Sequence, residues 1–304
     1  MAAVDSVFRL SAEVAAARSD NVPVVALEST IFSSMGLPSP ANHEALIRCE
    51  AAIRAGGAVP AVTAVIDGIA RVGIEPHEVE RVLAGVRKVA ERDLPVAIAQ
   101  RIDVGCTTVS ATVALCATAG VRVFATGGMG GVHRDDHLTG DVSADLEALA
   151  RHPVATVTAG AKAFLDLGKT LERLDTLGVP VIGMRTDRFP AFYTRDSGFA
   201  VPHRVETEAE AAAVLQARID LGLPGGVVVA NPIPEAAALP QEEVDQAIEA
   251  ALSAAAAAGL RGAAVTPFVL GRLAEVTGGR SIPANLALAE HNAAVAAGIA
   301  AALV

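Results

Sequence analysis

Short apolar runs alternate with longer segments of helical periodicity along most of the chain. The runs are rich in β-branched residues and end near Gly, Ser, Thr or Asn, which is typical of strands buried on both faces. They predict strands over 23–27, 121–126, 154–158, 180–184 and 226–231. Helical spacing of the apolar residues predicts helices near 41–55, 77–91, 107–119, 143–151, 160–178, 205–221, 241–259 and 284–303.

The segment 59–74 has a different pattern. Two apolar runs flank Asp67-Gly68, a dipeptide favoured in type I′ hairpin turns, so we expect a small antiparallel excursion there. Strands bounded by helices elsewhere indicate an α/β fold, with three α/β/α layers around a central, largely parallel (mixed) sheet. No repeat, linker or break in composition divides the chain, so we expect residues 1–304 to form one domain.

Composition narrows the class of protein. The net charge is −10 and no Lys/Arg-rich run exists, which argues against partners such as nucleic acid or anionic membranes. The three cysteines form no C-x-x-C pair, so neither a disulfide framework nor a zinc site is expected, and a reducing cytoplasm fits better. The first twenty residues lack the apolar core of a signal peptide. No run of 18 apolar residues exists, so we expect a soluble, cytoplasmic protein.

Two segments that follow predicted strands are candidates for chemistry. Glu28 closes the run 24-VVALEST-30, and ligands of open parallel sheets bind beyond the carboxyl ends of strands. A partly desolvated carboxylate there would have a raised pKa and could act as a general acid, unless it is a helix cap or a surface group. The glycine-rich 126-TGGMGGVHR-134 could present N–H groups to an anion and His133 to a substrate. The alternative is a tight structural turn with a surface histidine.

The segment 141-DVSADLEAL-149 offers three oxygen-bearing side chains at alternate positions. Asp141, Ser143 and Asp145 could together meet one hard cation such as Mg²⁺ or Mn²⁺. The alternative is helix capping, because Asp and Ser at a helix start accept hydrogen bonds from backbone N–H groups.

Lys162 and Asn285 could each act on a substrate or have only a structural role. Lys162 falls in the first turn of the helix predicted over 160–178, where the macrodipole would favour the neutral amine that Schiff-base chemistry needs. Otherwise it is an exposed lysine paired with Asp166. The side-chain NH2 and oxygen of Asn285 could hydrogen-bond to an amide-bearing heterocycle. Otherwise Asn285 is a polar residue near a helix start.

Ten blocks in order, spread over residues 20–302, resemble the pseudouridine-5′-phosphate glycosidase family, which includes indigoidine synthase A-like proteins. They are 25-VALESTIFSSMGLPSPAN-42, 58-AVPAVTAVIDG-68, 88-KVAERDLP-95, 107-TTVSAT-112, 124-FATGGMGGVHR-134, 141-DVSADL-146, 158-TAGAKAFLDLGKTLE-172, 190-PAFYTRDSGF-199, 226-GVVVANPIPE-235 and 266-TPFVLGRLAEVTGGRS-281. The resemblance implies a glycosidase (a lyase or hydrolase of nucleotide catabolism) that reversibly cleaves the C–C bond between C1′ of ribose 5-phosphate and C5 of uracil. It also implies a homotrimer.

The resemblance also implies roles for individual residues. Lys162 matches the nucleophile that forms a Schiff base with ring-opened ribose, and Glu28 the acid that protonates the ring oxygen. Asp141 falls on the position of the metal ligand, for one Mn²⁺ or another divalent cation per subunit. Substrate contacts fall on Lys88, Thr108, Val109, His133, Ser143, Ala144, Asp145 and Asn285.

The chemistry explains why such a set is needed. An ordinary glycosidase protonates a heteroatom leaving group, which a C–C bond does not offer, whereas an iminium at C1′ supplies an electron sink. The chain departs from the family pattern at Asp135-Asp136, at Arg101 and within 185–204. Relatives in antibiotic pathways join ribose 5-phosphate to other nucleophilic rings, so a C-glycosynthase acting on a non-uracil ring is the alternative.

Overall fold

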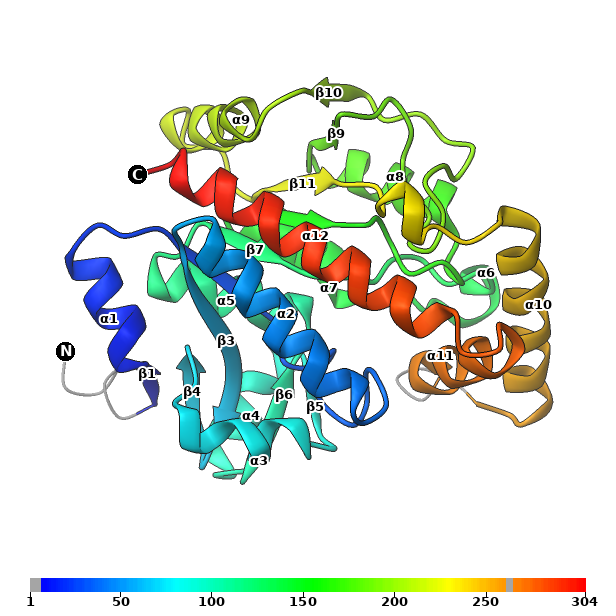
Figure 1. Cartoon of the computed structure of the whole chain (residues 1–304), viewed down its shortest axis with the longest axis horizontal. Helices are drawn as coiled ribbons and strands as arrows, with labels where there is room; N and C mark the ends of the chain where they lie inside the picture. The colour runs from blue at the N-terminus through cyan, green and yellow to red at the C-terminus, as the bar shows by residue number, and fades with distance from the viewer. Residues whose placement is uncertain (1–6, 261–264) are drawn as a thin grey trace.

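A mixed sheet of eleven strands runs through the part of the chain that the computed structural model describes, residues 7–260 and 265–304 (Figure 1). Its order is β1-β4-β3-β2-β7-β8-β11-β9-β10, with β6 paired to β3 and β5 to β6. All five predicted strands are confirmed and are mutually parallel: β2 (Val24–Leu27), β7 (Val123–Ala125), β8 (Ala155–Thr158), β9 (Val181–Met184) and β11 (Val227–Ala230). Their residues are buried, which explains their continuous apolar runs.

The predicted antiparallel excursion is confirmed and is larger than the pattern indicated. β3 (Val59–Ile66) and β4 (Ile69–Val72) form a hairpin, and the turn residues Asp67 and Gly68 have φ of 53° and 72°, as a type I′ turn requires. Strand β6 (Val104–Thr107) also pairs antiparallel with β3. The pattern did not predict β6 or the short strands β1 (Phe8–Leu10), β5 (Lys88–Val89) and β10 (His203–Val205).

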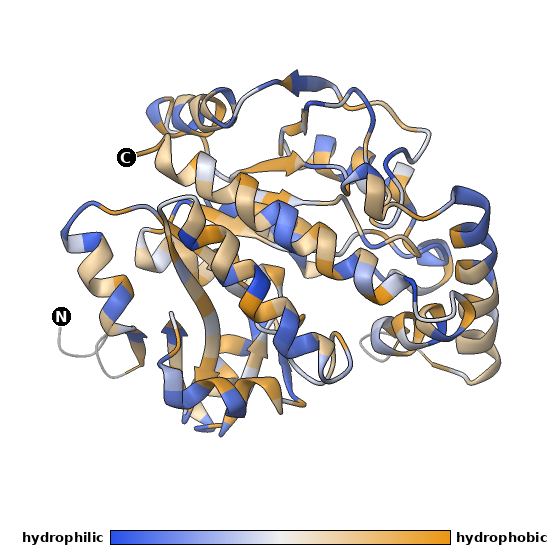
Figure 2. Cartoon of the chain, in the orientation of Figure 1, coloured by the Kyte–Doolittle hydropathy of each residue, from blue (hydrophilic) through white to orange (hydrophobic). Residues whose placement is uncertain are grey.

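Helices cover both faces of the sheet, which confirms the three-layer α/β prediction (Figure 1). On one face α12 (Ser281–Ala301) packs along α2 (Ala41–Ala55) and beside α9 (Glu208–Asp220). On the other face α5 (Val109–Ala119) packs against α7 (Ala144–Arg151). Figure 2 shows that the apolar residues concentrate on the strands between these layers. The remaining helices are α1 (Ala12–Ser19), α3 (Val79–Leu83), α4 (Leu94–Ala99), α6 (Asp136–Thr139), α8 (Leu167–Thr176), α10 (Gln241–Ala257), α11 (Val265–Val276), and the 3-10 turns at Pro76–Glu78, Glu91–Asp93 and Glu235–Ala237.

Two predicted helices are wrong over part of their length. The helix predicted over 160–178 begins only at Leu167, because Asp166 caps it by accepting a hydrogen bond from the Lys169 N–H. The helix predicted over 77–91 ends at Leu83. Gly85 then approaches Cys106 so closely that a Cβ would lie 2.4 Å from the sulfur, and the chain continues as strand β5. Lys162 therefore lies in a loop, and Lys88 on a strand.

The irregular segment 185–204 packs into the molecule. Phe189, Phe192 and Tyr193 are buried, and the Phe192 ring meets the Tyr193 ring edge-on at 4.7 Å. Phe192 also has a φ of 65°, a conformation that bulky residues rarely adopt. Among the described residues, no helix is long and apolar enough to cross a membrane.

Candidate active site

A cavity of about 260 Å³ lies beyond the carboxyl ends of β2, β7 and β8, and is called the main cavity below. This is the edge at which open parallel sheets bind ligands. All eleven residues selected from the sequence line it: Glu28, Lys88, Thr108, Val109, His133, Asp141, Ser143, Ala144, Asp145, Lys162 and Asn285. Sequence analysis did not select Thr126, Ser110 and Phe192, which line it too.

Strand-like pairing, not a helix, positions Lys162. Its N–H donates to the Met129 carbonyl at 3.0 Å, and Ala161 forms a parallel bridge with Met129. The expectation that a helix macrodipole acts on Lys162 is therefore wrong. The alternative of an exposed pair with Asp166 is also wrong, because Asp166 caps α8 and its Oδ2 lies 3.7 Å from Nζ of Lys169.

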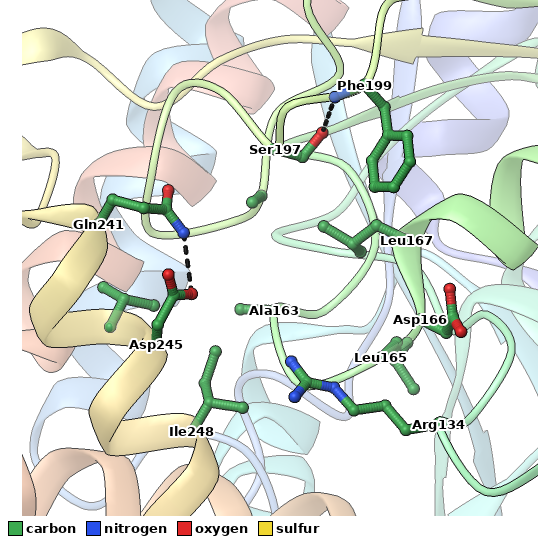
Figure 3. A pocket seen from close by; sticks show the side chains of 12 residues that line it. Arg134, Ala163, Leu165, Asp166, Leu167, Ser197, Phe199, Gln241, Asp245 and Ile248 are labelled. Atoms are coloured by element: carbon green, nitrogen blue, oxygen red, sulfur yellow. Dashed lines mark hydrogen bonds between the residues drawn. The ribbon is translucent and has the colours of Figure 1, made fainter.

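The loop around Lys162 separates the main cavity from a hollow of about 390 Å³, which Figure 3 shows with Ala163, Leu165 and Asp166 in its wall. Lys162 and Phe164 line the main cavity, whereas Ala163 and Asp166 line the hollow. Between the bridges at Ala161 and Asp166 the chain makes a turn, in which the Leu165 N–H donates to the Lys162 carbonyl at 3.0 Å. This turn explains how a segment with helix-like apolar spacing still directs its lysine into the site.

Glu28 is a buried carboxyl at the end of β2, only 6% exposed. Burial raises its pKa, against the opposing effects of the Lys162 charge, a hydrogen bond from Thr126 and the Lys88 charge. The raised pKa expected from the sequence is therefore confirmed. A protonated carboxyl that is shielded from water can act as a general acid.

Thr126 is held in place by two buried asparagines. Its carbonyl accepts a hydrogen bond from Nδ2 of Asn292 on α12 at 2.8 Å. The side chain of Asn292 accepts in turn from Nδ2 of Asn231, which follows β11, at 2.9 Å. This chain of amides links the ends of β7 and β11 to α12, and so fixes the hydroxyl that hydrogen-bonds Glu28.

Lys88 is half-buried on the short strand β5. Burial lowers the pKa of its ammonium, and the charge of Lys162 lowers it further, whereas Glu28 and Asp145 act in the opposite direction. Two lysines and two carboxylates therefore share one partly enclosed space. Shifted pKa values within one cleft, here those of Glu28 and Lys88, are typical of functional sites.

Asp145 joins three segments of the site. One carboxylate oxygen accepts from the Ser110 N–H at the start of α5 at 2.9 Å, and the other from the Gly130 N–H at 2.8 Å. Ser143 caps α7 by accepting from the Asp145 N–H, which confirms the capping interpretation for that residue. Because backbone amides occupy both Asp145 oxygens, the alternative of one cation held by Asp141, Ser143 and Asp145 is not supported.

Replacing Asp145 by Ala is expected to destabilise the fold by roughly 2–6 kcal/mol, since it leaves two buried N–H groups without acceptors at about 1–3 kcal/mol each. Urea unfolding measures the change. Asp145→Asn keeps one acceptor oxygen and should lose less, and Asp135→Ala, at an exposed position, should lose about 0.5 kcal/mol or less. Equal stability of Asp145→Ala and Asp135→Ala would contradict this role.

The glycine-rich segment 126–134 packs closely against neighbouring side chains, as the structural-turn interpretation requires, and Gly127, Gly128 and Gly130 also line the main cavity. A Cβ on Gly128 would lie 2.4 Å from the Phe192 ring, and one on Gly131 would lie 2.4 Å from Oγ1 of Thr170. The anion that meets the Gly130 N–H is the chain's own Asp145. His133, however, is no plain surface residue, because it lines the main cavity.

His133 and Asp141 are neighbours in the wall of the main cavity. Nε2 of His133 lies 3.8 Å from Oδ2 of Asp141, and the imidazole lies 6.2 Å from the Phe164 ring. In the described part of the chain, no three His, Cys, Asp or Glu side chains converge closely enough to hold a metal ion. A cation at Asp141 would therefore need water or substrate oxygens for most of its coordination, which Mg²⁺ and Mn²⁺ accept.

Asn285 has a buried amide oxygen that lacks a partner. The residue is 5% exposed and lines the main cavity from α12. Among the described residues, Oδ1 has no hydrogen-bond donor, and a Cβ built on Gly127 would lie 3.4 Å from it. Buried polar atoms are almost always paired, so this oxygen is suited to a ligand donor.

Comparison with known proteins places these features in a family. The family model of indigoidine synthase A like protein matches residues 13–302. A protein of Nocardioides sp. strain JS614 is 51% identical over 99% of this chain and 98% of its own length. A protein of Deinococcus radiodurans is 52% identical over 97% of this chain and 95% of its own length. Both relatives are named pseudouridine-5′-phosphate glycosidase.

Two solved structures have the same fold. The prealnumycin C-glycosynthase AlnA, in complex with ribulose 5-phosphate, is 36% identical with a TM-score of 0.89, covering 98% of this chain and 97% of its own. An indigoidine synthase A-like protein of Thermotoga maritima is 34% identical with a TM-score of 0.87, covering 97% of this chain and 95% of its own.

Proposed function

Because the chain belongs to the indigoidine synthase A-like family, we infer that it is an enzyme that cleaves the C1′–C5 bond of pseudouridine 5′-phosphate. The products are ribose 5-phosphate and uracil, and the reaction is reversible. The observation that carries this function is the meeting of Lys162 and the buried acid Glu28 in one cavity at the carboxyl edge of the sheet. An amine and an acid are the two groups that cleavage of a C–C glycosidic bond needs.

In the proposed mechanism the amine of Lys162 attacks C1′, the C1′–O4′ bond breaks, and Glu28 gives its proton to O4′. Glu28 then takes the proton that the nitrogen loses after its attack. The C1′–C5 bond breaks as the nitrogen lone pair forms an iminium between C1′ and Lys162, and that proton passes from Glu28 to C5 of uracil. Water hydrolyses the iminium, which releases ribose 5-phosphate, and the proton set free returns to Glu28, so that the amine and the acid are both restored.

The remaining residues are proposed to bind the substrate. Lys88 carries positive charge beside the N-terminus of α5, where Thr108 and Val109 line the cavity, which suits a phosphate. Asn285 offers its free oxygen to an N–H of the ring. His133, with Ser143 and Ala144 beside it, lines the side next to Asp141, which suits the hydroxyls of the sugar.

We further propose Asp141 as the ligand of one Mn²⁺ or another divalent cation, which would supply a fixed positive charge for substrate oxygens. Wild-type protein is expected to bind Mn²⁺, and Asp141→Ala to bind it on the order of tenfold more weakly or not at all. Electron paramagnetic resonance of free Mn²⁺ measures binding without an activity assay. Asp135→Ala, which removes a neighbouring exposed carboxylate, is the matched control. Unchanged binding by Asp141→Ala would overturn the assignment.

A homotrimer in the cytoplasm is also part of the proposal, on the family resemblance. Sedimentation equilibrium is expected to give three chain masses. One chain mass at all concentrations would contradict it.

Incubation with pseudouridine 5′-phosphate tests the activity directly. We expect release of uracil and ribose 5-phosphate, and formation of pseudouridine 5′-phosphate from the two products. The second candidate, a C-glycosynthase, is supported by the 36% identity to AlnA over nearly the whole chain. It predicts that ribose 5-phosphate joins a non-uracil ring while uracil does not react.

A further inference from the structure

A second cavity of about 200 Å³ adjoins the main cavity, and is called the side cavity below. The two cavities share four lining residues, which are Met35, Gly36, Leu270 and Asn285. The two spaces therefore adjoin at these residues. The wall beyond them is formed by α11, which lies against α12 (Figure 1).

The charged groups and the shared wall have different chemistry. Glu28, Lys88, Asp145 and Lys162 line the main cavity and do not line the side cavity. The shared wall carries two apolar side chains and the amide of Asn285. A sugar phosphate suits the charged groups, and a planar ring with polar edges suits the wall that contains Asn285.

Two further features place the ring against this wall. The free Oδ1 of the buried Asn285 offers an acceptor where the cavities meet. The rings of Phe192 and Tyr193 continue the wall on both sides, Phe192 in the main cavity and Tyr193 in the side cavity. The Tyr193 phenol lies beside Ser281 and Asn285, and so contacts the amide of Asn285 from the side cavity.

The side cavity is largely apolar and reaches the surface. Its α11 wall consists of Pro267, Leu270, Gly271 and Ala274, and Gly271 is exposed to solvent. A Cβ built on Gly271 meets no atom within 4 Å, so this part of the wall is open space. A ring substituent that passes the residues shared by the two cavities therefore enters open space.

We propose that the side cavity continues the ring subsite, so that the enzyme accepts rings that carry an alkyl substituent larger than anything on uracil. This inference rests on the proposed function, because it concerns the same reaction run towards synthesis. In that direction C1′–C5 bond formation releases the proton of C5, and the oxygen of C1′ leaves as water. A ring therefore needs a nucleophilic carbon, and the substituent must sit elsewhere on the ring.

The test is synthesis from ribose 5-phosphate with uracil and with 1-, 3- and 6-propyluracil, all of which keep C5 free. We expect the wild type to form a C-nucleotide from uracil and from at least one propyl ring. Gly271→Leu should lower kcat/KM for that propyl ring by on the order of tenfold, since filling a pocket with a few methylenes has effects of this size. For uracil its kcat/KM should change by less than about threefold.

The control is Arg272→Leu, which adds the same side chain one residue along α11 at an exposed position outside both cavities. It should leave both rings unaffected, and helix stability should not fall in either variant because leucine favours helices. Product from uracil but none from any propyl ring overturns the inference and leaves the proposed function standing. Equal slowing of both rings by Gly271→Leu also overturns it. Product from a propyl ring but none from uracil supports the inference and overturns the proposed function.

Discussion

Lys162→Ala is expected to lower the rate of pseudouridine 5′-phosphate cleavage by roughly 10³-fold or more, because it removes the nucleophile of the proposed mechanism. The loss should appear in kcat, with the substrate still bound by Lys88, Asn285 and the remaining cavity residues. A steady-state assay of uracil release measures it, together with direct titration of substrate binding.

Lys169→Ala is the matched control for this variant. Lys169 belongs to the same sequence segment, but it is exposed on α8 and pairs with Asp136 and Asp166. Its loss should leave the rate unchanged within about twofold, since exposed ion pairs contribute little. A fully active Lys162→Ala enzyme would remove the basis of the mechanism.

Glu28→Gln is expected to slow cleavage by about 10²–10⁴-fold, the usual contribution of a general acid. The pH dependence follows from the raised pKa of Glu28. The acid works in its protonated form, so wild-type activity should fall as pH rises through that raised pKa. The variant should lose this alkaline limb, which a kcat/KM profile from pH 5 to 9 would show.

Stability provides the fold control for Glu28→Gln. A carboxyl whose folded pKa is raised contributes its full stability below the unfolded pKa and loses it as pH rises through the folded pKa. At pH 8 the buried Glu28 therefore favours unfolding, and the glutamine variant should have a thermal midpoint no lower than the wild type. An unchanged alkaline limb in the variant would show that Glu28 is not the acid. Glu44→Gln, exposed on α2, should alter neither quantity.

The central sheet was predictable because its strands are buried on both faces and so consist of continuous β-branched runs. Strands such as β1 and β10 have three residues each, too few to give a period-2 signal. The error at 160–166 has another cause. Its apolar residues recur at helical spacing, yet they pack in a loop whose two ends pair with Met129 and Val132 of the glycine-rich segment.

The candidate site residues came from the ten blocks that resemble the family, and the structure brings them to one cavity. The residues and contacts that the sequence did not reveal depend on partners distant in the chain. Thr126 is one of many hydroxyls near a strand end, and only the fold brings it to Glu28. Asn292 lies in an alanine-rich helix without any local signal of its bond to Thr126. The two amides that Asp145 binds could not be inferred from capping patterns alone.

Trapping of the covalent intermediate tests the central claim most directly. Wild-type enzyme is incubated with ribose 5-phosphate and reduced with sodium borohydride, and the modified residue is located by peptide mass spectrometry. The account predicts a stable ribose 5-phosphate adduct on Lys162, present in Lys169→Ala and missing in Lys162→Ala. Full cleavage activity with no adduct on Lys162, or an adduct on Lys88 instead, would contradict it.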